Sequence, residues 1–76
     1  MTRPAATETL LGYDEICDVL AAVPVILRET RRRNGLSMRD AGDRIGVAAS
    51  TVMRWERQHA EPSTSDIIAI LRWAAT

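Results

Sequence analysis

The sequence predicts an all-α fold, a compact bundle of four to five helices, on three observations. Apolar residues recur at steps of three and four, which is the spacing of one helix face. Two Ser-x-x-Asp pairs, Ser37 with Asp40 and Ser63 with Asp66, are typical of helix N-termini. No alternating β-branched sequence flanks an Asn-Gly or Asp-Gly turn, so nothing predicts a strand. With 76 residues, the chain can build one small domain.

The N-terminal part of the chain changes character at Leu10. After Met1, residues 1–9 contain no large apolar side chain and are expected to form a flexible tail. From Leu10 onward the pattern is that of an amphipathic helix. Its apolar positions are Tyr13, Ile16, Cys17, Leu20, Val23 and Leu27.

Pro24 interrupts this helical pattern. Because proline fits the first turn of a helix better than its interior, we expect two helices that meet near Ala22. The first is an N-terminal accessory helix over residues 10–23, and the second begins the main domain, residues 24–76. The second helix is expected to end at Gly35, after three arginines whose charges suit the negative end of the helix dipole.

Three further helices follow from capping signals and apolar spacing. They are residues 38–45, after Ser37 and before Gly46; residues 50–57, which Ser50 begins or caps; and a last helix from Ser63 to the C-terminus, after a loop at 58–62.

The two short helices within residues 38–57 are joined by a tight turn, and neither is long enough to be stable alone. Their apolar and small residues fall at the fourth, fifth, eighth, ninth, tenth, fifteenth and eighteenth positions from Met38. These residues are Ala41, Gly42, Ile45, Gly46, Val47, Val52 and Trp55. All seven agree in type with the twenty-residue helix-turn-helix motif, so residues 38–57 resemble that motif.

The resemblance extends beyond the motif, over roughly residues 24–75. The matching segments are Leu27 to Arg31, Gly35 to Ser37, Ile45 to Val47, Ser50-Thr51, Trp55 to Arg57 and Pro62-Ser63. Together they are similar to the phage repressor and Cro (XRE-like) family. The resemblance implies a lambda-repressor-like bundle and a sequence-specific transcriptional regulator, for example a repressor, that binds double-stranded DNA.

In that family the second helix of the motif, here about residues 49–57, lies in the DNA major groove. The residues that the resemblance places against the bases are Ala48, Ala49, Ser50, Thr51, Met53 and Arg54. Arg54 is the main candidate, because a bidentate contact from arginine to guanine discriminates by about 1–3 kcal/mol. The alternative for Arg54 is a solvated arginine on an exposed face.

Phosphate contacts are expected from residues beside the groove, and these are Ser37, Arg39, Arg57, Arg28, Arg32 and Arg33. Solubility alone is the alternative for each of these arginines. By resemblance, Arg31 pairs with Glu56 as a structural clamp that fixes the angle of the recognition helix. Two departures from the family pattern are Ala41-Gly42, where Leu-Ala is preferred, and Gln58, where a helix-ending glycine is common.

Charge placement limits what the chain can bind. Ten arginines and ten acidic residues give a net charge of zero, which argues against a polycation that coats nucleic acid. Residues 1–27 nevertheless carry −3 and residues 28–61 carry +3. The positive charge therefore lies on the segment that contains the DNA-binding unit. An excess of only three charges predicts a binder that needs pairing or a partner.

Alternative functions are a protein-interaction module on the same fold, such as an antitoxin, an anti-repressor or a regulator subunit. The N-terminal helix would then serve a protein partner or a homodimer. The chain has no phosphate loop, metal-ligand cluster or catalytic pairing of recognised spacing, so we expect no enzyme, cofactor or small-molecule substrate. One cysteine and the lack of a signal or membrane segment favour a cytoplasmic, nucleoid-associated protein of a bacterial or phage-infected cell.

Overall fold

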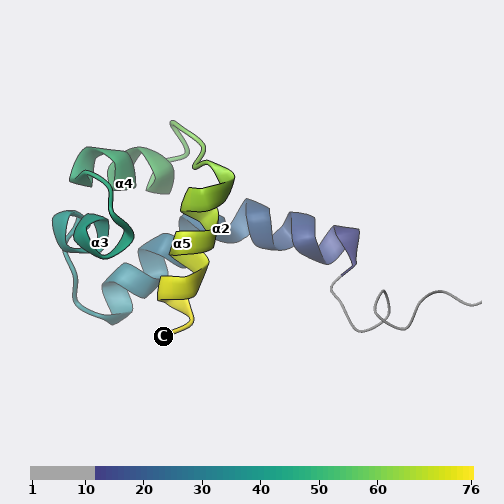
Figure 1. The fold of residues 1–76 in the computed structure, drawn as a ribbon, viewed down its shortest axis with the longest axis horizontal. Helices are drawn as coiled ribbons and strands as arrows, with labels where there is room; N and C mark the ends of the chain where they lie inside the picture. Colours follow the sequence, from purple (N-terminus) through teal and green to yellow (C-terminus); the bar gives the residue numbers. More distant parts are fainter. Residues whose placement is uncertain (1–11) are drawn as a thin grey trace, which may run out of the picture.

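Four α-helices form the part of the chain that the computed structural model describes, residues 12–76, and no strand occurs in that part (Figure 1). The helices are α2 (Tyr13–Arg33), α3 (Met38–Ile45), α4 (Ala49–Glu56) and α5 (Thr64–Ala74). The expected all-α bundle is thereby confirmed. The tail expected at residues 1–9 lies outside the described residues.

Pro24 lies inside α2, so the predicted break near Ala22 is wrong. The φ angle of proline is compatible with a helix, and its ring removes one hydrogen bond to the preceding turn. Val23 and Leu27, on either side of this defect in the chain, are both buried in the core. Their burial offsets the lost hydrogen bond and keeps the accessory segment and the start of the main domain in one continuous helix.

The helix ends in this structure are set by local hydrogen bonds. At the end of α2, Gly35 has a φ of +66°, and the N–H groups of Gly35 and Leu36 donate to the carbonyls of Arg32 and Arg31, at 3.0 and 2.9 Å. This is a Schellman motif, which a glycine in the left-handed conformation favours. Capping boxes begin α3 and α5, as the two Ser-x-x-Asp pairs predicted.

The core lies where α4 and α5 pack against α2, and α3 packs against α4 and α5. Its buried residues are Val23, Leu27, Ala41, Val52, Trp55 and Ile70. Partly buried residues complete it, namely Met38, Ile45, Val47, Ile67 and Trp73. All four helices thus contribute apolar side chains to a single cluster.

The N-terminal half of α2 runs out of this bundle, away from the other three helices (Figure 1). Its apolar side chains are correspondingly exposed, with Tyr13 89% exposed and Leu20 46% exposed. Among the described residues, no helix is both long enough and apolar enough to cross a membrane.

Candidate nucleic-acid interface

The turn between α3 and α4 depends on two glycines. Gly46 ends α3 with a φ of +94°, which a side chain would strain. The N–H groups of Gly46 and Val47 both donate to the carbonyl of Gly42, at 2.7 and 2.8 Å. A Cβ on Gly42 would overlap the backbone oxygen of Val47. The chain therefore folds back closely on α3 and brings α4 against it.

The eight-residue helix α4 has two distinct faces. Its inner face, Val52, Trp55 and Glu56, is buried. Its outer face, Ser50, Arg54 and Arg57 at steps of four and three, is exposed, with Arg57 as the C-cap. The inner face holds α4 on the bundle, and the outer face has no neighbour within the described chain.

The six residues expected to read bases are not equally accessible. Ala48, Ser50 and Arg54 are exposed, whereas the other three are partly buried, namely Ala49, Thr51 and Met53. The Arg54 Nη2 donates a hydrogen bond to the Thr51 Oγ1 at 3.3 Å, so this guanidinium is held along the helix surface.

The start of α4 differs from the expected one. Ala48, with an extended backbone at φ −72° and ψ 154°, is the N-cap, and Ser50 is the second residue of the helix. No side chain caps this end. The prediction that Ser50 begins or caps this helix is therefore wrong. The left-handed conformation of Gly46 turns the chain so that the cap lies two residues earlier, at Ala48.

The residues expected to contact phosphates lie on α2, at the start of α3 and after α4. Arg32 and Arg33 are exposed at the end of α2, Arg39 is exposed in the first turn of α3, and Arg57 follows the last residue of α4. Ser37 is exposed, and its hydroxyl accepts the N–H of Asp40 at 3.0 Å within the capping box.

Arg28 differs from the other expected phosphate contacts, because it is partly buried. Its Nε atom is buried, has no hydrogen-bond partner and lies 3.9 Å from the Oε1 of Glu29. Arg28 is therefore less available to a partner than the four exposed arginines.

Arg31 and Glu56 form a bidentate ion pair between the end of α2 and the end of α4. The Nε and Nη2 of Arg31 donate to the two carboxylate oxygens of Glu56, at 2.8 and 2.9 Å. The two side chains are 15% and 4% exposed. The Nη1 of Arg31 also donates to the Leu36 carbonyl at 3.3 Å, a backbone contact that no sequence pattern indicated.

The hydrogen bond to Glu56 raises the pKa of Arg31 above its ordinary value. The stability that this shift contributes is complete below the ordinary arginine pKa and is lost only as the pH rises through the higher folded value. Arg31 therefore remains positively charged in this ion pair at neutral and moderately alkaline pH.

The end of α4 is a second Schellman motif, built without glycine. Gln58 has a φ of +59°, and the N–H groups of Gln58 and His59 donate to the carbonyls of Trp55 and Arg54, at 3.1 and 2.8 Å. In the sequence, Gln58 is a departure from the family pattern, because the family commonly has a helix-ending glycine at this position. The structure shows that the left-handed conformation is retained at this position although the residue is not glycine.

No group of three His, Cys, Asp or Glu side chains in residues 12–76 is placed to hold a metal ion. In the same range, Cys17 and His59 are both exposed and belong to no such group.

Comparison with known proteins agrees with this geometry. A family model described as helix-turn-helix matches residues 27–72, which is more than half of the chain and includes α3, the turn and α4. Searches of curated proteins and of solved structures gave no significant match. The family match confirms the resemblance to the phage repressor and Cro (XRE-like) proteins. With its buried inner face, its exposed outer face and this match, the chain belongs to the helix-turn-helix family of DNA-binding regulators.

Proposed function

We propose that the protein is a sequence-specific transcriptional regulator of the Cro/repressor type that places α4 in the major groove of double-stranded DNA. The observation that carries this proposal is the division of α4 into a buried inner face and an exposed outer face, within the segment that matches the family. A helix anchored on one side and free on the other fits a groove about 12 Å wide.

Base reading is assigned to the outer face and to the N-terminal end of α4. Arg54 is exposed, and its hydrogen bond to Thr51 limits the directions in which its guanidinium can point. A guanidinium held in this way can donate to O6 and N7 of guanine. Ala48, Ala49 and Ser50 are short, so they supply contacts to a thymine methyl group or a single hydroxyl hydrogen bond. Such a surface gives modest specificity.

Phosphate binding is assigned to the arginines around this helix. Arg39 and Arg57 are exposed on α3 and at the end of α4, and Arg32 and Arg33 are exposed at the end of α2. Arg31 has a different role, because its Nε and Nη2 donate to Glu56. We assign to this pair the orientation of α4 relative to α2, on which simultaneous base and phosphate contacts depend.

The dependence of affinity on salt tests this proposal. With four to six phosphate contacts per subunit, a plot of log affinity against log salt for a pool of random duplexes should have a slope of about −4 to −5. Fluorescence anisotropy measures this slope. The Arg57→Ala variant should reduce its magnitude by about 1, whereas Arg72→Ala, which removes an exposed arginine from α5, should leave it unchanged. Failure of the protein to bind at about 50 mM salt would exclude DNA recognition.

A protein-interaction module, such as an antitoxin, an anti-repressor or a regulator subunit, is the second candidate. The exposed apolar side chains of Tyr13, Ile16 and Leu20 favour it, as does the zero net charge. A pull-down from host lysate with and without nuclease separates the two functions, because a DNA-mediated association is lost after nuclease treatment. Either function is consistent with the proposed location in the cytoplasm, at the nucleoid.

A further inference from the structure

The exposed half of α2 carries an apolar stripe that leads into a groove of the bundle. Its residues follow one another at steps of three, four and four, along one side of the helix, and are Tyr13, Ile16, Leu20 and Pro24. The side chains of Tyr13, Ile16 and Leu20 are 89%, 41% and 46% exposed. Among the described residues no other helix covers the start of this stripe, because the N-terminal half of α2 runs away from the bundle (Figure 1).

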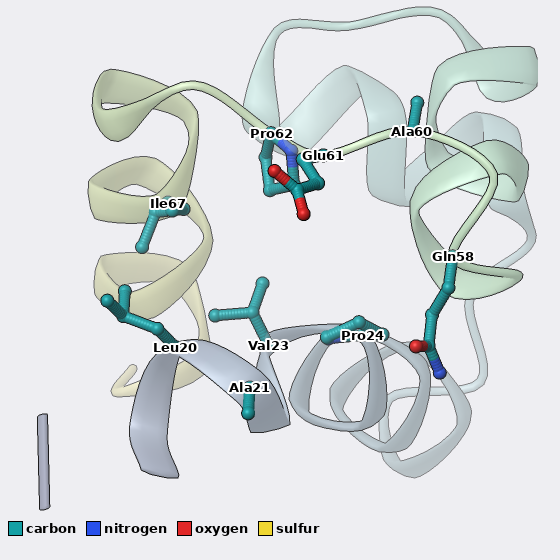
Figure 2. A pocket seen from close by; sticks show the side chains of 9 residues that line it. All are labelled: Leu20, Ala21, Val23, Pro24, Gln58, Ala60, Glu61, Pro62 and Ile67. Atoms are coloured by element: carbon teal, nitrogen blue, oxygen red, sulfur yellow. The ribbon is translucent and has the colours of Figure 1, made fainter. Parts of the chain in front are cut away.

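The groove has a volume of about 420 Å³ and lies between α2, the loop after α4, and α5. Its apolar wall includes Leu20 and Pro24 from the stripe and Ile67 from α5. Two polar side chains complete it: the carboxylate of Glu61 points into the space, and the amide of Gln58 lies on the side away from Ile67 (Figure 2). Ligand sites commonly have volumes of about 300–1,000 Å³, so this groove has room for side chains of a partner.

Charge selects the occupant of this surface. Residues 12–27 contain three acidic side chains, at positions 14, 15 and 18, and no basic one. Among the residues that line the groove, Glu61 alone is charged. A helix with its side chains is about 10–12 Å wide, so the acidic residues of α2 lie within about one Debye length of anything bound to the stripe. Such a surface attracts lysine and arginine side chains and repels DNA phosphates and anionic lipids.

We propose that the stripe and the groove bind a basic amphipathic helix of another protein. The apolar side of that helix packs along the stripe and inserts side chains into the groove, which is the helix-in-groove mode of recognition. Its lysine or arginine side chains pair with Glu61 and with the acidic residues of α2. A second copy of residues 12–27 does not meet this requirement, because it would add three more carboxylates and no basic side chain.

This surface is separate from the one assigned to DNA. No residue of α3 or α4 lines the groove, and neither does any of the residues assigned to base or phosphate contacts. The two activities therefore use different side chains. The proposal goes beyond DNA binding and stands whether or not α4 reads bases.

Peptide selection on the full chain, without DNA, tests the proposal. The probe is a displayed library of random peptides of about 16 residues, which as a helix extend over about 24 Å. The wild-type chain should enrich peptides that carry an excess of lysine and arginine and apolar residues at steps of three and four. The binding of one enriched, labelled peptide is then measured by fluorescence anisotropy. Its dissociation constant should rise with salt concentration, because salt screens the attraction to the carboxylates.

Two variants test the apolar and the charged part of the surface. Leu20→Asp places a charge in the stripe and should raise the dissociation constant of the peptide at least about tenfold. Its matched control is Val25→Asp, which adds the same charge at an equally exposed position, 46% in both cases, but about 140° around the helix. Glu61→Gln should raise the dissociation constant about threefold. Asp43→Asn, which removes an exposed carboxylate from α3, should leave it unchanged.

All four substituted side chains are exposed, so each variant should retain the helical circular dichroism of the wild type. Arg54→Ala should bind the peptide as the wild type does, which separates this test from that of DNA binding. The proposal is overturned if no peptide is enriched, if the enriched peptides lack an excess of basic residues, or if either test variant binds as tightly as its control. A wild-type dimer that Leu20→Asp dissociates would place a second copy on this surface and would also overturn it.

Discussion

The inner and outer faces of α4 belong to one short helix and its C-cap, Arg57, but have different physical requirements. Every residue of the inner face has a partner inside the domain, either the apolar core or Arg31. The residues of the outer face are exposed, and the guanidinium of Arg54 donates a hydrogen bond to Thr51 of the same helix. The comparison shows that stability and recognition reside on separate sides of one helix, so substitutions should affect one property without the other.

Removal of Trp55 tests the comparison most severely. Trp55→Ala deletes the largest side chain of the inner face and should lower the free energy of unfolding by about 3–5 kcal/mol, which is most of the stability of a domain of this size. Urea denaturation followed by circular dichroism measures this loss. Arg54→Ala, the adjacent change on the outer face, should stay within about 0.5 kcal/mol of wild type. Equal losses for the two variants would contradict the assignment of the faces.

Removal of one partner of the ion pair should have the next largest effect. Glu56→Ala leaves the largely buried guanidinium of Arg31 without its carboxylate partner and should cost about 3 kcal/mol. The double variant Arg31→Met/Glu56→Leu places apolar side chains at both positions and should recover a large part of this loss. A double variant that is less stable than Glu56→Ala would show that the pair contributes net stability rather than orientation.

The close approach at the turn predicts a smaller but definite loss. Gly42→Ala places a Cβ against the backbone oxygen of Val47, which cannot rotate away, and should cost about 1–3 kcal/mol. Gly12→Ala is the matched control, because a Cβ there meets no atom within 4 Å. Thermal unfolding should show a clear decrease in Tm for the first variant and a change of at most a few degrees for the second.

The end of α4 offers a small gain in stability. Gln58→Gly removes the strain of a side chain at a φ of +59° and should stabilise the domain by about 0.5–1 kcal/mol, or roughly 4 °C in Tm. Gly35→Gln, at the matching position after α2, should have the opposite sign, since Gly35 has a φ of +66°. A decrease in Tm for Gln58→Gly would mean that the glutamine side chain makes a compensating contact.

Elements with local signals could be predicted from the sequence. Each capping box needs two side chains three residues apart, and the stop at Gly35 needs one glycine, so these boundaries were correct. The seven motif positions also indicated the packing of α3 on α4, since apolar spacing and a turn glycine are visible in the chain itself. The partners Arg31 and Glu56 are 25 residues apart, and family resemblance rather than any local pattern related them.

Features that depend on packing could not be predicted in this way. Whether Pro24 ends a helix depends on the burial of Val23 and Leu27 on either side of it, which only the folded core determines. The cap at Ala48 follows from the path of the turn and not from a capping side chain. The groove at Ile67 is formed by segments that are distant in sequence, so no local pattern marks it.

The central claim is that the outer face of α4 reads base edges, and selection of bound duplexes from a random pool tests it most directly. The wild-type chain should enrich a motif that contains a fixed guanine, and Arg54→Ala should lose selectivity at that one position while binding the remainder of the motif. Failure of the wild-type chain to enrich any sequence would contradict the claim. An unchanged motif from Arg54→Ala would contradict the assignment of base reading to Arg54.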